Sequence, residues 1–312
     1  MKSDRRAFIS LTTGSVLLSF LHKQTGAQQN KRTRVILLGT KGGPTITASG
    51  RSNPSTLLLI NDVPYVVDCG YGASKQLLKA GVAHRDIRYI FCTHLHSDHG
   101  IEYGTLFYNA WEAGRKEPID SYGPPGLEKM TRDYFSYMGI DIDTRIIDEG
   151  RPDPRKMITA HEITNNGTVM QNDDVKVSCI RVPHPMVKDA FAYRFDTKDR
   201  SIVMSGDTAY SPALADFAKG ADVLIHEAMY LPGIEAIVRS SPNTTRLREH
   251  LMASHTSTED VGRVAARAGV KTLVLSHFVP GGDPTITDDM WAEGVRKHFS
   301  GQIVVGRDLL EV

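Results

Sequence analysis

The chain has 312 residues, of which 40% are hydrophobic and 23% charged, and its formal net charge is +1 at pH 7. This composition suits one large globular domain, and it lacks the clustered lysine and arginine runs that neutralise nucleic-acid phosphates. It also excludes a disulfide framework, because the only cysteines are Cys69, Cys92 and Cys179. We expect these to be buried free thiols, although an exported protein can pair two of them.

The first 27 residues are typical of a twin-arginine export signal. An Arg5-Arg6 pair precedes an apolar stretch over residues 8–21, and a small-residue site ends at Ala27. The stretch is shorter than the roughly 20 residues of a membrane span, so we expect a periplasmic protein without a stable membrane anchor. Removal of residues 1–27 takes away four basic residues and one acid, which lowers the formal charge from +1 to −2. We therefore do not expect nucleic acid as a partner.

The remaining chain, residues 33–312, is predicted to form one domain that begins with short apolar strands. Turn-forming residues separate the strands, and a glycine, Gly81, follows the first predicted helix as a C-terminal cap would require. The predicted elements of this half are strands Arg34–Leu38, Ser55–Ile60, Pro64–Asp68 and Tyr89–Cys92 and a helix over Ser74–Ala80.

The segment from Tyr103 to Glu162 has the weakest pattern. It mixes aromatic residues with turn formers, and Tyr134 and Met138 are spaced four apart, as in ordinary helix packing. Some of these aromatic side chains belong to the core, and others could line a substrate pocket, since pockets are largely apolar. The sequence leaves open which ones do.

The second half again alternates strands and helices. Ser257 and Asp260 have the spacing of a capping box, which marks the start of a helix. The two halves together predict an α/β fold, an αββα sandwich with its polar loops at one sheet edge. The predicted elements of this half are strands Val175–Val182, Phe191–Phe195, Ile202–Ser205, Val223–Ile225 and Thr272–Leu275 and helices Pro212–Ala218 and Thr258–Ala268.

The run Thr93–Gly100 carries the clearest chemistry. It places His94, His96, Asp98 and His99 within six positions, directly after an apolar strand. Neutral imidazole and carboxylate suit a borderline cation such as zinc, and residues i and i+2 on extended backbone point to one side. Histidines scattered by chance rarely form this H-x-H-x-D-H pattern, so we interpret it as a metal site.

Further candidate ligands follow other predicted strands: His184, Asp207 and His277, together with Asp68 in Val66-Val67-Asp68-Cys69-Gly70. In this order the motifs resemble the metallo-β-lactamase superfamily of dinuclear metallohydrolases, which has the αββα four-layer sandwich fold. The resemblance covers nearly all of the chain after residue 32. It implies two Zn²⁺ per chain, with Asp207 bridging both and Asp68 orienting a ligand. One zinc would be held by His94, His96 and His184, and the other by Asp98, His99 and His277.

Two more segments narrow the branch. His226-Glu227-Ala228-Met229 and His255-Thr256-Ser257-Thr258 resemble the HEAT and HST loops of the tRNase Z-like branch, which also includes exported arylsulfatases. The resemblance implies that His255 is a general acid held by Glu227, while Asp98 orients a metal-activated hydroxide.

Two departures concern the substrate. The P-x-K-x-R-N loop of tRNA-processing members is replaced by a segment without lysine from Gly43 to Asn53. The long tRNA-clamping arm has no room either, because the short stretch from His184 to Asp207 fits only two strands, Ala190–Asp196 and Ser201–Ser205.

We therefore expect an exported dizinc hydrolase of small-molecule sulfuric or phosphoric esters, closest to arylsulfatase-like or phosphodiesterase-like members and compatible with a homodimer. The alternatives are a tRNase Z-like 3′-tRNA endoribonuclease, a lactonase or a β-lactamase, of which the last is disfavoured by the bridging Asp207. A non-catalytic metal-binding module is the weakest alternative, because no ligand position is missing.

Overall fold

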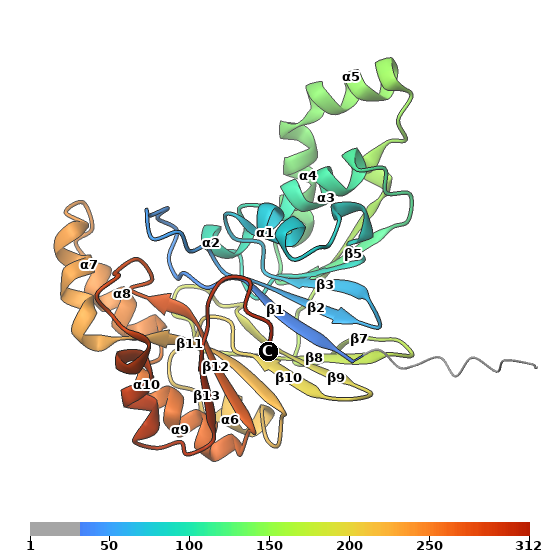
Figure 1. The fold of residues 1–312 in the computed structure, drawn as a ribbon. Coiled ribbons are helices and arrows are strands. Elements are labelled where there is room, and N and C mark those ends of the chain that lie inside the picture. Colours follow the sequence, from blue (N-terminus) through green and yellow to red (C-terminus); the bar gives the residue numbers. More distant parts are fainter. Residues whose placement is uncertain (1–31) are drawn as a thin grey trace, which may run out of the picture. The chain divides into compact units, whose positions relative to one another are not determined.

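The computed structural model describes residues 32–312, whose strands form two sheets (Figure 1). The predicted export signal, residues 1–27, lies outside the described residues and stays a prediction. The first sheet contains, in order, β1 (Arg34–Gly39), β2 (Ser55–Ile60), β3 (Val63–Val67), β4 (Tyr89–Phe91), β5 (Ile119–Gly123) and β6 (Ile158–Glu162). The second contains, in order, β13 (Gln302–Val305), β12 (Thr272–Val279), β11 (Val223–Met229), β10 (Ser201–Met204), β9 (Phe191–Thr197), β8 (Val175–Arg181) and β7 (Gly167–Gln171).

Helices cover the outer face of each sheet (Figure 1). On the first sheet lie α1 (Ala73–Lys79), α3 (Tyr103–Glu112) and α4 (Leu127–Tyr137). The short helix α2 (Ser97–Gly100) follows β4, and α5 (Gly139–Glu149) extends away from the sheet but contributes Ile142 to the same core. On the second lie α6 (Pro212–Phe217), α9 (Thr258–Ala268) and α10 (Asp288–Arg296), with α7 (Ile234–Ser240) and α8 (Leu247–Ser254) at one end. Short 3₁₀ turns occupy His84–Asp86, Pro154–Lys156 and Leu231–Gly233.

The order of the layers follows from alternation along the strands. In β1, Val35 and Leu37 belong to the core between the two sheets, whereas Ile36 and Leu38 belong to the core under the first helix layer. Strands β10, β11 and β12 divide their side chains in the same way between the inter-sheet core and the second helix layer. Because successive strand residues point to opposite faces, a sheet with two apolar faces must be covered on both sides. The predicted αββα sandwich is therefore confirmed.

Two parallel groups of strands position the polar loops. Strand β3 pairs in parallel with β4, and β10, β11, β12 and β13 pair in parallel with one another. Parallel strands end at the same edge of a sheet, which is where ligands bind in open α/β sheets. The residues that follow β3, β4 and β10 are therefore brought together at one edge of the sandwich.

Several element ends differ from the sequence prediction. Strand β11 continues to Met229, and β12 continues to Val279, so that Glu227 and His277 lie within strands instead of loops. The register between these two strands shifts between Glu227 and Ala228, and His277 is the extra residue opposite that step, with a φ of 42°. Such a bulge turns one side chain away from the regular pleat. The apolar pattern could not reveal it, because it arises from pairing between strands.

Three smaller findings concern residues 32–312. Cys69, Cys92 and Cys179 are buried and free, as predicted. The region between His184 and Asp207 contains the antiparallel strands β9 and β10, as predicted, and no further helix or strand. Within this described range, no helix has both the length and the apolar character needed to cross a membrane.

The inter-sheet core is centred on Phe91, and its removal tests the packing of the two layers. The Phe91 ring stacks on Tyr122 of its own sheet and meets Tyr193 and Phe195 of the other sheet edge to face. We expect Phe91→Ala to lower the free energy of unfolding by about 3–5 kcal/mol, because the cavity lies where both sheets meet. Urea unfolding followed by circular dichroism would measure this.

The matched control is Ile140→Ala, since Ile140 is 89% exposed. Its free energy of unfolding should change by about 0.5 kcal/mol or less. A loss below about 1 kcal/mol for Phe91→Ala would show that the two sheets do not depend on this contact.

Candidate metal centre

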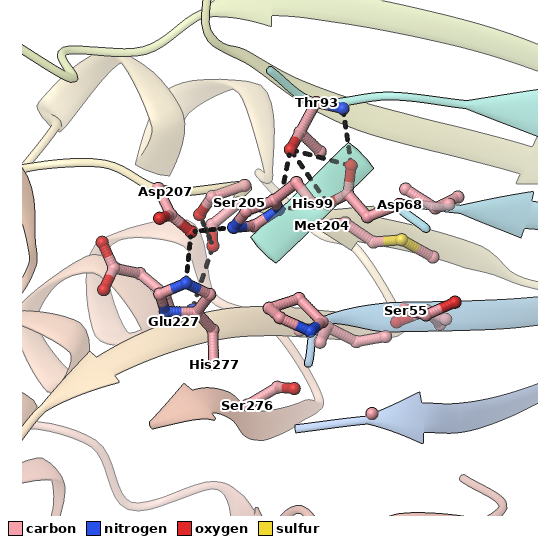
Figure 2. Close-up of a pocket in the computed structure, with 16 residues that line it drawn as sticks. Ser55, Asp68, Thr93, His99, Met204, Ser205, Asp207, Glu227, Ser276 and His277 are labelled. Carbon is pink, nitrogen blue, oxygen red and sulfur yellow. Dashed lines mark hydrogen bonds and ion pairs between the residues drawn. The ribbon is translucent and has the colours of Figure 1, made fainter. Parts of the chain in front are cut away.

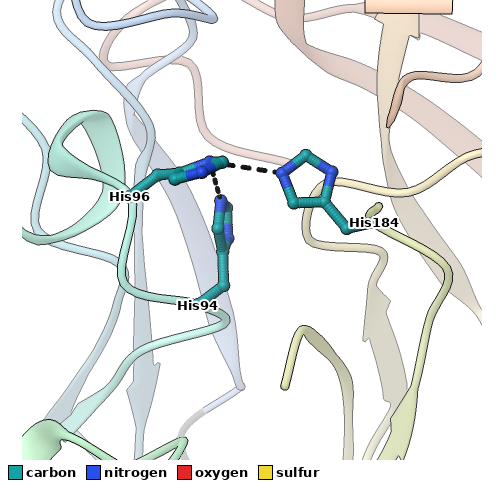
Figure 3. Close-up of side chains that lie close together, drawn as sticks. All are labelled: His94, His96 and His184. Carbon is teal, nitrogen blue, oxygen red and sulfur yellow. Dashed lines mark hydrogen bonds between the residues drawn. The ribbon is translucent and has the colours of Figure 1, made fainter. Parts of the chain in front are cut away.

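Three histidines from two different elements form the first ligand cluster (Figure 3). The Nε2 atom of His94 lies 3.1 Å from Nδ1 of His96, and Nε2 of His184 lies 3.2 Å from the same atom. His94 and His96 follow β4, and His184 follows β8 of the other sheet. Their ring nitrogens converge within 4.8 Å of one another, a spacing that suits three nitrogen ligands of one cation.

Two carboxylates and two histidines form the second cluster beside it. Figure 2 shows three of its four members, His99, Asp207 and His277. Nε2 of His99 lies 3.2 Å from Oδ1 of Asp207, and Nε2 of His277 lies 3.1 Å from the same oxygen. Asp98 completes the group, with its Oδ2 atom 3.5 Å from Nε2 of His277 and 3.7 Å from Nε2 of His99. These four side chains are buried and come from both sheets.

Asp207 links the two clusters through its two oxygens. Oδ1 faces His99 and His277, whereas Oδ2 lies 3.8 Å from Nε2 of His94 in the first cluster. The predicted bridging position is thus occupied by a carboxylate that addresses both clusters.

Hydrogen bonds behind the rings fix which nitrogen faces the site. Nδ1 of His99 donates to Oδ2 of Asp68 at 2.8 Å, and Asp68 also accepts from the backbone N–H and the hydroxyl of Thr93. Nδ1 of His184 donates to the Ser254 carbonyl at 3.2 Å. A histidine that donates from one nitrogen presents a lone pair on the other, so both rings turn an Nε2 lone pair toward the clusters.

The donor atoms fit a cation better than they fit one another. Nε2 of His99, Nε2 of His277 and Oδ1 of Asp207 are fully buried, yet none has a hydrogen-bond partner of acceptable geometry among the described residues. Buried polar atoms without a partner are costly, and three that converge on one point are best explained by a bound ion. Imidazole nitrogen and carboxylate oxygen are the ligands of zinc and similar divalent metals.

The electrostatics agree with this fit. Burial lowers the pKa of His94 well below its ordinary value and that of His184 to about 4, so these rings are neutral, which is the form that binds metals. Burial opposes charge on His277 as well, but the negative charge of Asp207 outweighs it and raises the pKa of His277 to about 10. The second cluster is therefore a place that attracts positive charge.

Glu227 and His255 form a separate pair beside the second cluster. Nδ1 of His255 lies 3.0 Å from Oε2 of Glu227, and the other carboxylate oxygen of Glu227 accepts from the Thr208 N–H at 2.8 Å. Burial alone would lower the pKa of His255, but the charge of Glu227 and this hydrogen bond raise it. The His255 ring stacks on His277 at 5.5 Å, and its centroid is 5.8 Å from that of His184. The predicted orienting partner is in place.

Two glycines near the first strand support the second cluster, and sequence reasoning missed them. The Gly43 N–H donates to Oδ2 of Asp98 at 2.9 Å. A Cβ atom on Gly42 would lie 2.7 Å from the His277 ring, so only glycine fits against this histidine. Gly42 and Gly43 are among the turn-forming residues that follow the first predicted strand. Their position beside His277 depends on contacts between residues far apart in the chain, which the sequence does not show.

His250 is a further histidine near the site that sequence reasoning missed. It is exposed on α8, and its ring centroid lies 6.0 Å from that of His255, 6.2 Å from His184 and 6.4 Å from His96. Its Nδ1 atom is 3.3 Å from the hydroxyl of Ser254. His250 and Ser254 are one helical turn apart, so a predicted helix ending at Ser254 would have placed His250 on the side of the site.

Comparisons with known proteins agree with this architecture. The family model described as beta-lactamase superfamily domain matches residues 65–278. A ribonuclease Z from Mycobacterium marinum is 32% identical over 281 residues, which cover 89% of this chain and 97% of the relative. Human tRNase Z, short form, aligns with a TM-score of 0.64 at 21% identity, covering 89% of this chain and 98% of that one. Zn²⁺-bound PqqB from Methylobacterium extorquens aligns with a TM-score of 0.66 at 15% identity, covering 89% and 99%.

These comparisons correct two sequence-based expectations. An arylsulfatase-like hydrolase of small-molecule esters was the leading expectation, and nucleic acid was not expected as a partner. Relatives named ribonuclease Z, aligned over almost their full length, contradict both expectations, whereas export stays a prediction. The physical reason is that the net charge used for that expectation, −2 after removal of residues 1–27, averages the whole surface. It also omits any bound cations, which are often the largest local charges in a metal site. Overall charge therefore does not decide whether a phosphodiester can bind at the centre.

Asp68 provides a test of the hydrogen bonds behind the ligands. Asp68→Asn keeps the shape of the side chain but offers His99 only a neutral amide, so we expect zinc affinity to fall by roughly 10–100-fold with little change in fold. Competition with a zinc-binding dye would measure the affinity. The control is Asp216→Asn, whose carboxylate pairs with Arg267 on the surface. Unchanged zinc affinity in Asp68→Asn would contradict an orienting role.

Proposed function

The chain belongs to the metallo-β-lactamase superfamily and to its ribonuclease Z-like branch, and from that premise we propose that it is a metal-dependent phosphodiesterase that removes 3′ extensions from precursor tRNA. The family is one of hydrolases, so the general reaction class follows from membership. The RNA substrate is proposed from the ribonuclease Z relatives and from the arrangement of the centre.

The observation that carries the proposal is the single carboxylate shared by two ligand clusters. Oδ1 of Asp207 faces one cluster, and Oδ2 faces the other. Paired cations bridged in this way are typical of enzymes that displace a leaving oxygen from phosphorus, because the two charges act on the attacking and the leaving oxygen.

We assign seven residues to two zinc ions. His94, His96 and His184 would hold one ion, Asp98, His99 and His277 would hold the other, and Asp207 would bind both. When bound, the ions supply Lewis acidity toward the phosphodiester and lower the pKa of a water molecule toward neutrality. Asp98 also accepts the Gly43 N–H, so the loop before β2 holds this carboxylate in place.

His255 and Glu227 complete the proposed catalytic set. Glu227 holds Nδ1 of His255, so Nε2 is free to carry the proton that the departing ribose oxygen needs. The charge of Glu227 and its hydrogen bond outweigh burial and raise the pKa of His255, which favours the protonated ring. A ribose oxygen is a poor leaving group, and it gains more from protonation than a nitrophenolate does.

Residues between His184 and Asp207 form β9 and β10 and leave no room for an arm that clamps tRNA. We therefore propose that the RNA is held by surfaces beside the metal centre. In this proposal, the segments that surround His96, His184 and His255 contact the RNA.

Cleavage of a precursor tRNA with a short 3′ trailer tests the function. We expect the zinc-loaded wild-type chain to release the trailer at physiological salt, and His255→Ala to lose roughly 10²–10⁴ in kcat on this substrate. The same variant should lose much less on bis(p-nitrophenyl) phosphate, because that leaving group departs without a proton. Gel separation of labelled RNA and absorbance at 405 nm provide the two readouts.

The control for this experiment is His298→Ala, since His298 contacts Glu259 on the surface away from the centre. Hydrolysis of the nitrophenyl ester without any cleavage of precursor tRNA would contradict the RNA substrate. Equal losses of His255→Ala on both substrates would contradict its role as the proton donor.

Elemental analysis tests the number of metals. We expect close to two zinc ions per wild-type chain, and we expect Asp207→Ala to lose most of the second ion because both clusters share this residue. Asp216→Ala, which removes a surface carboxylate, should retain both ions. A wild-type content of one ion or none, in protein purified without chelators, would refute the dizinc assignment.

A further inference from the structure

A pocket opens beside the candidate metal ligand His96, and no role has been assigned to it. It has a volume of about 350 Å³ and is bounded by the loop Leu95–Ser97, by α2 with the start of α3, and by one face of α4. On α4 the lining residues include Met130, Tyr134 and Tyr137. A metal ligand thus forms part of the wall of a largely apolar pocket.

The two tyrosines of this wall differ in how firmly they are held. A Cβ atom on Gly104 would lie 2.0 Å from the Tyr134 ring, so this ring packs directly on the backbone of α3. Tyr134 also meets Phe107 edge to face at 5.1 Å. Tyr137, three residues further along the helix, is 82% exposed, and Ile101 on the opposite wall is 59% exposed. The pocket therefore has a fixed aromatic base and an exposed apolar rim.

We propose that this pocket binds the nucleobase adjacent to the scissile phosphodiester, with Tyr137 as its stacking partner. The inference rests on the proposed function. A phosphate bound at the metal centre would lie near His96, and a neighbouring base would then be within reach of the pocket, because His96 belongs both to the first ligand cluster and to the pocket wall. Aromatic side chains that accept any base by stacking are the usual device for holding single-stranded nucleic acid.

The charges around the pocket favour stacking over phosphate binding as the source of affinity. The basic side chains of α4 are already paired with acids of the same helix: Lys129 with Asp133, and Arg132 with Glu128 at 3.5 Å. A base, which is uncharged and planar, can enter without displacing these pairs. A second copy of the chain is a weaker candidate for the occupant, because the exposed apolar residues Ile140 and Ile147 on α5 lie outside the pocket.

Three small phosphodiesters separate base binding from catalysis. Thymidine 5′-(p-nitrophenyl phosphate) and thymidine 3′-(p-nitrophenyl phosphate) carry a base on either side of the phosphate, and methyl p-nitrophenyl phosphate carries none. We expect Tyr137→Ala to lower kcat/KM by roughly tenfold on at least one thymidine ester, mainly through KM, and to leave the methyl ester unchanged. Tyr137→Phe keeps the ring and should stay within about twofold of the wild type.

The matched control is Ile147→Ala, which removes an apolar side chain that is 85% exposed on the neighbouring helix. It should leave all three esters unchanged. Calorimetric titration of thymidine 5′-monophosphate and thymidine 3′-monophosphate into zinc-loaded protein gives a readout without catalysis, and Tyr137→Ala should weaken the tighter of the two by a similar factor.

The outcomes distinguish this inference from the proposed function. Suppose that precursor tRNA is not cleaved but Tyr137→Ala lowers activity on a thymidine ester and not on the methyl ester. The base pocket is then supported, and the tRNA substrate is refuted. If precursor tRNA is cleaved but Tyr137→Ala affects no ester or all esters equally, the base pocket is refuted. Conversion of a dimer to a monomer by Tyr137→Ala in light scattering, with equal loss on every ester, would also refute it and identify a subunit interface.

Discussion

The structure depends on the burial of negative charge between its two sheets. Asp207 is buried, and its two oxygens face the imidazoles of His94 and His99, which follow β4, and of His277 in β12. A carboxylate in this position is tolerated only with positive charge beside it, because desolvation of an unpaired charge costs several kcal/mol. The proposed pair of cations would satisfy this requirement and would link ligands from both sheets. The same burial makes these charges effective in catalysis, since water does not screen them.

The candidate site was predictable where its signal is local in the chain. The H-x-H-x-D-H run and the strand-ending residues Asp68 and Asp207 lie close together in space because parallel strands end at one edge, a rule that holds without knowing the register. Gly42 and Gly43 were not predictable as site residues, because each matters through a contact between distant segments. The bulge at His277 was not predictable for the same reason, because predicting it requires the register between β11 and β12.

The fold shows the same division between local and distant information. The alternation of side chains along the strands predicts sheets with two apolar faces, and the capping residue Ser257 predicts where a helix begins. Sheets that must be covered on both faces then predict the sandwich. In the segment from Tyr103 to Glu162, the sequence could not tell buried aromatic residues from exposed ones, because both kinds occur there. Tyr103 and Trp111 are buried, while Tyr137 is exposed. The substrate was misjudged for a related reason: net charge is a property of the whole chain, and recognition is a property of one surface.

The two halves of the sandwich contribute unequally to chemistry and recognition. Ligands come from both sheets, so the centre exists only when the sheets are packed together, and a change in any ligand affects the same reaction. The proposed proton-donating pair, Glu227 and His255, belongs to the second half, whereas the pocket beside His96 is built by α2, α3 and α4 of the first. Helices outside the ligand set can change without disturbing the metals. If the pocket beside His96 binds part of the substrate as proposed, α4 bears on substrate choice without contributing a metal ligand. The ligand motifs alone would then indicate the reaction class and not the substrate.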